Sequence, residues 1–168
     1  GAWSWKFVLE RLRAADHDAR ALPFRGVGER AAELSPGLDN DVFTEDTVAT
    51  LEREDLRDIV LVGHSFRSLI ASLVTDRIPE RIGHLVIIDG GIAQDGQSIF
   101  GRIPPAIAAK RQTLVKVVND TEVLPFAPVG SLIIDDPELA AWTHRQLTPH
   151  PVACYTKPIR LANPAGNG

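Results

Sequence analysis

Apolar residues follow two different periods in the first half of the chain. Four consecutive branched or leucine side chains occur at Ile59-Val60-Leu61-Val62 and again at Leu85-Val86-Ile87-Ile88. Runs of this kind are typical of strands buried on both faces of a parallel sheet. Between them, the apolar residues of Phe66–Thr75 recur at helical spacing. The pattern predicts a strand at 58–63, a helix at 66–75 and a strand at 84–89.

The segments before this unit are also predicted to form helices and a strand. Residues 5–15 carry one apolar stripe at helical spacing, and residues 41–54 repeat that pattern more weakly. Residues 19–24 are expected to form a short strand, and the glycine- and proline-containing stretch 25–40 a loop. Strands and helices that alternate with short connections predict an α/β layer fold with a mostly parallel sheet.

The alternation stops after Gly91. An alanine-rich helix is predicted from Pro104-Pro105 to about residue 118. Another helix is predicted to begin at Asp136-Pro137, where the aspartate would cap the helix N-terminus and the proline would occupy the first helical position. Prolines interrupt the rest of the chain after Gly91, so no strand is expected in that part. We therefore expect one partial domain over 1–168, with a sheet core at 1–91 and a helical lid at 92–168.

Composition narrows the range of partners and cofactors. The 168 residues include 22 acidic and 18 basic side chains, a net charge of -4, which argues against nucleic acid or an anionic membrane as partner. No apolar run approaches the roughly 20 residues of a membrane span. No N-terminal leader is visible, so a cytoplasmic location is expected. The single cysteine, Cys154, and the scattered histidines predict no disulfide and no metal site.

A strand, a Gly-x-Ser turn and a helix follow one another at residues 59–75. In Gly63-His64-Ser65-Phe66-Arg67, the tight turn would push the Ser65 hydroxyl out of the sheet, with Gly63 allowing close packing. The backbone N–H of Phe66 would then lie at the helix N-terminus, where an oxyanion could be bound. An ordinary strand–turn–helix with an incidental serine is the simpler alternative. Arg67 favours that alternative, because such a turn usually carries a second glycine there.

The wider context resembles the α/β-hydrolase superfamily, in the branch of hydroxynitrile lyases, salicylate-type methyl esterases and their bacterial relatives. The segments that carry the resemblance are Gly26–Arg30, Asp55–Ser65, Ile78–Ile82, Leu85–Asp89, Asp95–Ser98 and Leu147–Pro151. The resemblance implies that Ser65 is the nucleophile and that the Phe66 N–H forms half of the oxyanion hole. His64 occupies the variable position of the turn. Asp89 matches a position where some relatives place the triad acid, while most place it one strand later; a polar strand-end residue is the alternative.

The resemblance also implies that parts of the family's site lie outside the chain. The sequence has no methionine and opens on Gly1, so we expect a fragment that lacks both ends. The family's histidine base, its usual acid and the turn that supplies the second oxyanion N–H would then be missing. So would the strand between 19–24 and 58–63, which predicts a fragment that folds poorly and is inactive alone.

The function implied is hydrolysis of a small carboxylic ester through an acyl-enzyme on Ser65, without a cofactor. Two alternatives stay open. The same residues would suit a lyase of the hydroxynitrile type that cleaves a carbon–carbon bond. Arg67 would instead suit a catalytically dead homologue that only binds a ligand. The acyl and alcohol groups of the substrate and the oligomeric state are not indicated by the sequence.

Overall fold

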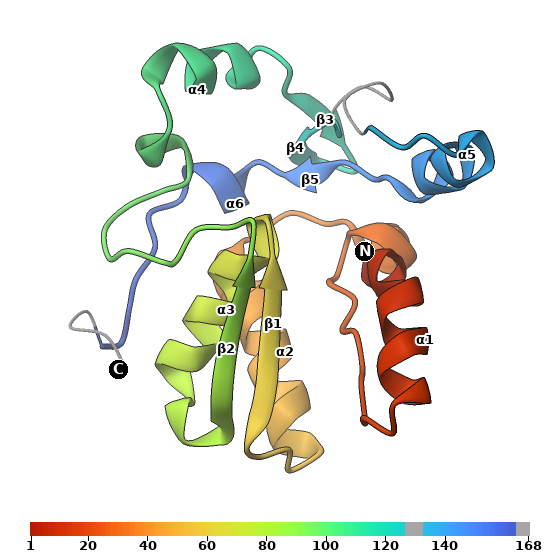
Figure 1. Ribbon diagram of the computed structural model, residues 1–168. Helices are drawn as coiled ribbons and strands as arrows, with labels where there is room; N and C mark the ends of the chain where they lie inside the picture. Colours follow the sequence, from red (N-terminus) through yellow and green to blue (C-terminus); the bar gives the residue numbers. More distant parts are fainter. Residues whose placement is uncertain (127–132, 164–168) are drawn as a thin grey trace. The chain divides into compact units, whose positions relative to one another are not determined.

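The computed structural model describes residues 1–126 and 133–163, and its backbone forms two compact units (Figure 1). One unit contains residues 1–38 and 111–152, and the other contains residues 39–110 and 153–168. The predicted division into a sheet core at 1–91 and a lid at 92–168 stays a prediction. Parts of that lid segment, 127–132 and 164–168, lie outside the described residues.

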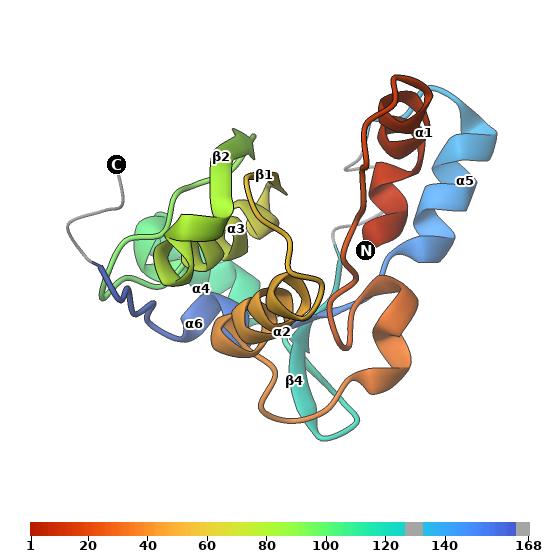
Figure 2. The same cartoon turned by 90° about the horizontal axis from the view of Figure 1, so that it is seen from below.

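The unit of residues 39–110 and 153–168 contains the predicted strand–helix–strand motif. Strands β1 (Ile59–His64) and β2 (Ile82–Ile88) pair in parallel, and α3 (Phe66–Arg77) connects them. Helix α3 packs on both strands and α2 (Asn40–Arg53) packs on α3. Figure 2 shows both helices on the same side of the two strands. The short elements of this unit are η3 (Pro79–Arg81), η4 (Phe100–Arg102) and α6 (Ala153–Thr156). The predicted α/β fold is therefore confirmed.

The expectation that both strands are buried on both faces is wrong for the described residues. Val60 is 61% exposed, and Val62, Val86 and Ile88 are exposed as well. Val62 pairs with Val86, so these side chains share one face, since residues two apart on a strand point the same way. The helices α2 and α3 cover the opposite face, which leaves this one open.

The unit of residues 1–38 and 111–152 contains shorter elements. They are η1 (Ala2–Trp5), α1 (Lys6–Ala14), η2 (Gly28–Glu33), β3 (Lys116–Val118), β4 (Thr121–Leu124), α5 (Pro137–Gln146) and β5 (His150–Pro151). Helices α1 and α5 match the predicted helices, and Asp136 caps α5 by accepting hydrogen bonds from the N–H groups of Glu138 and Leu139. The strand predicted at 19–24 is wrong: this segment belongs to neither described sheet.

The helix predicted from 104 to about 118 ends early, and strands follow where none was expected. Helix α4 spans Pro105–Gln112, and β3, β4 and β5 form an antiparallel sheet. The missed signal is Asn119-Asp120, the two-residue loop between β3 and β4, with φ values of 49° and 55°. Asparagine and aspartate tolerate positive φ at a two-residue hairpin turn better than most residues.

This turn gives a prediction on stability. Asp120→Gly is expected to raise the free energy of unfolding by about 0.5–1 kcal/mol, because glycine adopts positive φ without a Cβ penalty. Asp120→Val is expected to lower it, since branched side chains disfavour positive φ. Urea unfolding of both variants and the parent measures the difference. Equal stability of the three proteins would contradict this account of the hairpin.

Candidate active site

Ser65 lies in the turn between β1 and α3, in a backbone conformation that side chains rarely adopt. Its φ is 53° and its ψ is -125°, and the residue is exposed. The Ser65 N–H donates to the carbonyl of Ile88 at 3.0 Å, and its carbonyl accepts from the N–H of Ser68 at 3.1 Å. These bonds tie the turn to β2 and to the first turn of α3. A strained residue persists where its surroundings hold it in this way, and such residues cluster at functional sites.

Two glycines allow the backbone to close tightly around this turn. A Cβ on Gly63 would lie 2.6 Å from Ser68 Cα and 2.9 Å from the carbonyl oxygen of Arg67. A Cβ on Gly90 would lie 2.6 Å from the Ser65 carbonyl oxygen. Real side chains do not approach backbone atoms so closely. Gly63 therefore sets the distance between β1 and α3, and Gly90 lets the chain after β2 pass beside Ser65.

Phe66 is the first residue of α3, which runs for 12 residues to Arg77. The first N–H groups of a helix have no partner within the helix, and the helix dipole makes this end favourable for negative charge. An oxyanion formed on a substrate held at Ser65 would meet this end of α3. The half-buried Phe66 ring lies 5.7 Å from the ring of Tyr155, centroid to centroid.

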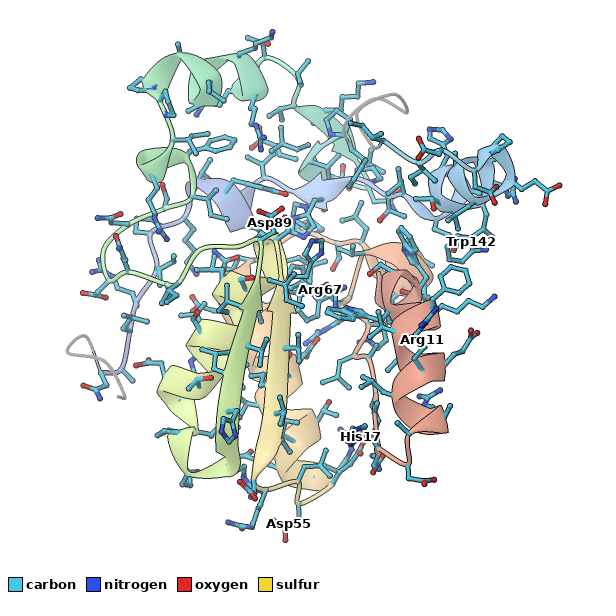
Figure 3. The ribbon with its side chains drawn as sticks, viewed as in Figure 1. Arg11, His17, Asp55, Arg67, Asp89 and Trp142 are labelled. Carbon is cyan, nitrogen blue, oxygen red and sulfur yellow. The ribbon has the colours of Figure 1, made fainter. Side chains whose placement is uncertain are left out.

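Asp89 follows β2 directly, as Ser65 follows β1. His64 pairs with Ile88 in the parallel register, so the structure brings Ser65 and Asp89 to the same end of neighbouring strands. Figure 3 shows Asp89 at this end and Asp55 at the other. Asp89 has a φ of 43° and is exposed, and its carboxylate makes no hydrogen bond or ion pair with any of the residues described. This position keeps Asp89 as a candidate for the triad acid.

Arg67 and Ser68 occupy the start of α3, where a hydrolase turn usually has small residues. The Arg67 side chain is half-buried, and Figure 3 places it near the same end of the strands as Asp89. Ser68 is fully buried. A Cβ on Gly90 would lie 2.0 Å from its hydroxyl oxygen. The Ser68 side chain thus fits against residue 90 because a glycine at that position has no side chain.

Sequence reasoning missed Tyr155 and Phe100, two aromatic residues that form a cluster with Phe66. The Tyr155 ring, on α6, lies 5.6 Å from the ring of Phe100 as well as against Phe66. Aromatic pairs at such distances contribute about 0.5–1.5 kcal/mol each beyond their buried area. No local pattern could have indicated these contacts, since the three residues come from η4, α3 and α6.

Helix α6 is fastened to the start of α2 by buried and charged contacts. The amide of buried Asn40 donates to the carbonyl of Cys154 at 3.0 Å. Lys157 donates to Asp39 at 2.6 Å and to Asp41 at 2.9 Å, and these hydrogen bonds raise the pKa of Lys157 above its usual value. Burial raises the pKa of the Cys154 thiol, which keeps it neutral and unreactive. Both contacts determine where Tyr155 lies.

Residues 1–126 and 133–163 contain neither a cluster of metal ligands nor a helix suited to a membrane. In that part of the chain no group of three or more His, Cys, Asp or Glu side chains could hold a metal ion. Over the same residues, no helix has both the length and the apolar character that a membrane crossing requires.

Comparison with known proteins finds relatives that are named as esterases. No protein-family model matches the chain. It is 27% identical over 172 residues to a carbendazim hydrolyzing esterase of Nocardioides sp. (strain SG-4G), covering 96% of this chain and 69% of the relative. It is 33% identical over 91 residues to esterase PIR7B of Oryza sativa subsp. japonica, covering 52% of this chain and 34% of the relative.

A solved structure shows the same fold. An extracellular alpha/beta-hydrolase from a Paenibacillus species, described as sharing structural and functional homology with tobacco salicylic acid binding protein 2, matches with a TM-score of 0.83. Its identity to this chain is 22%, and the match covers 96% of this chain and 66% of that one. The chain therefore has an α/β-hydrolase fold, as its sequence predicts. It spans between 34% and 69% of the length of these three proteins.

Proposed function

We propose that the complete protein hydrolyses small carboxylic esters, with Ser65 as the nucleophile. The observation that carries the proposal is the backbone of Ser65, which has φ 53° and ψ -125° between a strand and a helix. This strained turn exposes the serine hydroxyl beside the N-terminus of α3, as acyl transfer requires. Relatives named as esterases support the choice of an ester as substrate.

The reaction would proceed in two steps through an acyl-enzyme. The Ser65 hydroxyl oxygen bonds to the acyl carbon while a histidine takes its proton, and the carbon–oxygen bond to the alcohol then breaks as the alcohol receives that proton. Water attacks the acyl-enzyme in the same way and releases the acid. The Phe66 N–H stabilises the oxyanion in both steps. We assign the base and the second oxyanion donor to parts of the complete protein beyond these 168 residues, and Asp89 is one candidate for the acid that orients the base.

A fluorophosphonate probe tests this assignment. The serine oxygen of an activated nucleophile displaces fluoride from phosphorus, and the product carries the probe covalently. In the complete protein we expect a single labelled residue, Ser65, located by mass spectrometry of the digested protein. Prior denaturation should prevent labelling, because the reaction needs the folded site. Labelling of a different serine, or none in a protein that hydrolyses esters, would exclude Ser65 as the nucleophile.

A catalytically dead homologue that binds an ester-sized ligand is the second candidate, and Arg67 is the observation that favours it. The half-buried guanidinium stands where the turn usually has glycine. A complete protein that is neither labelled nor active on esters would favour this candidate.

We also propose that the segment 92–168 acts as the lid over the substrate. We further propose that the protein works in the cytoplasm, as its single cysteine suggests.

A further inference from the structure

Tyr155 is the residue from which we draw a further inference, and this inference rests on the proposed esterase function. Its ring lies between those of Phe66 and Phe100, at centroid distances of 5.7 and 5.6 Å and interplanar angles of 40° and 36°. Phe100 is only 7% exposed, so the Tyr155 ring packs against a buried side chain. Phe66 is the neighbour of Ser65 in the chain. Tyr155 therefore contacts the side chain of the residue whose N–H is proposed to bind the oxyanion.

The position of Tyr155 is determined by its neighbours on both sides. Helix α6 has only 4 residues, too few to be stable without tertiary contacts. Before Tyr155, Cys154 is completely buried and its carbonyl accepts the Asn40 amide at 3.0 Å. After it, Lys157 binds Asp39 and Asp41, and the N–H of Ile159 donates to the carbonyl of Gln97 at 2.9 Å. These bonds hold the tyrosine in place independently of the aromatic contacts.

The turn at Ser65 needs such support because its backbone is strained. The bonds to Ile88 and Ser68 hold the main chain of Ser65, but neither acts on the Phe66 side chain. A residue with unfavourable φ and ψ relaxes when the structure around it allows. Loss of the ring that packs on Phe66 would let the start of α3 shift and move the Phe66 N–H. A displacement of about 1 Å at a reacting group can cost roughly 100-fold in rate.

We propose that Tyr155 is a positioning residue for the nucleophile turn. Its ring holds the Phe66 side chain, and thereby the Phe66 N–H, where the oxyanion forms. The role that we assign belongs to the tyrosine ring, which packs against the rings of Phe66 and Phe100. Tyr155→Phe should therefore behave as the parent, and Tyr155→Leu should not.

The test uses the complete protein with 4-nitrophenyl acetate, whose two-carbon acyl group fills little of any pocket. For Tyr155→Leu we expect kcat to fall about 10- to 100-fold and KM to stay within about threefold, because a transition-state contact is lost. The Ki of a trifluoromethyl ketone should rise by the same factor as kcat falls. The serine oxygen bonds to the carbonyl carbon of this ketone while the base takes the serine proton, and the ketone oxygen then occupies the oxyanion position. Phe7→Leu, which removes an aromatic partner of Trp142 in the other unit, is the matched control and should change none of these values.

Three results would overturn the inference. The first is an unchanged kcat and Ki in Tyr155→Leu. The second is a rise in KM with unchanged kcat, which indicates a substrate contact, and the third is a Tyr155→Phe variant as slow as Tyr155→Leu. If Tyr155→Leu does not fold, Lys157→Gln replaces it, since Lys157 is 47% exposed and its loss only loosens α6. Unchanged kcat and Ki in Lys157→Gln would then count against the proposal. Ser65→Ala separates this inference from the proposed function: if Ser65→Ala retains ester hydrolysis, Ser65 is not the nucleophile and the proposed mechanism itself fails.

Discussion

Replacing Ser65 with alanine in the complete protein is expected to lower kcat on a carboxylic ester by about 10⁵–10⁶-fold. The reason is that no acyl-enzyme can form without the serine oxygen, and the remaining oxyanion donors and binding contacts give only residual acceleration. The measurement is hydrolysis of a chromogenic ester, with circular dichroism to show that the variant is folded. A loss of less than about 10-fold would mean that another group attacks the ester.

Two control variants separate chemistry from structure in this experiment. Ser98→Ala removes another serine hydroxyl of the same unit, one that accepts a hydrogen bond from the N–H of Gly101, and should leave kcat within a few-fold of the parent. Ser65→Gly should be as inactive as Ser65→Ala but more stable by about 1 kcal/mol, because glycine adopts φ 53° without strain. Equal stability of the two variants would contradict the strained conformation of Ser65.

The parts of the fold that sequence reasoning predicted depend on neighbouring residues in the chain. The apolar runs at 59–62 and 85–88 and the helical spacing at 66–75 are local patterns, and β1, β2 and α3 form where they indicate. The turn at Ser65 was predictable for the same reason, since Gly63, Ser65 and the start of α3 lie within a few residues.

The incorrect predictions concern features that depend on distant residues. An apolar run such as Ile59–Val62 does not tell whether one or both faces of its strand will be covered, and here Val60 and Val62 are exposed. The segment 19–24 has no described strand beside it with which it could pair. The aromatic contacts of Tyr155 depend on how α6 is fastened to Asn40 and Asp39, which no pattern near residue 155 indicates.

Replacing Gly63 with alanine is expected to lower both stability and activity. The new Cβ would lie 2.6 Å from Ser68 Cα and 2.9 Å from Ser68 N, both backbone atoms of α3 that cannot rotate away. Helix α3 would have to move away from β1, at a cost of about 3 kcal/mol in the free energy of unfolding. The same shift would displace the Phe66 N–H, so kcat of the folded fraction should fall about 100-fold.

The matched control for this variant is Gly91→Ala. The nearest atom to a Cβ at Gly91 is the terminal nitrogen of the Arg102 side chain at 3.4 Å, which can move without changing the backbone. Its stability should stay within about 0.5 kcal/mol of the parent, as for other substitutions that meet only flexible groups. Chemical unfolding and ester hydrolysis of both variants test the comparison. If Gly63→Ala is as stable and as active as Gly91→Ala, close packing of β1 on α3 does not determine the geometry of the nucleophile turn.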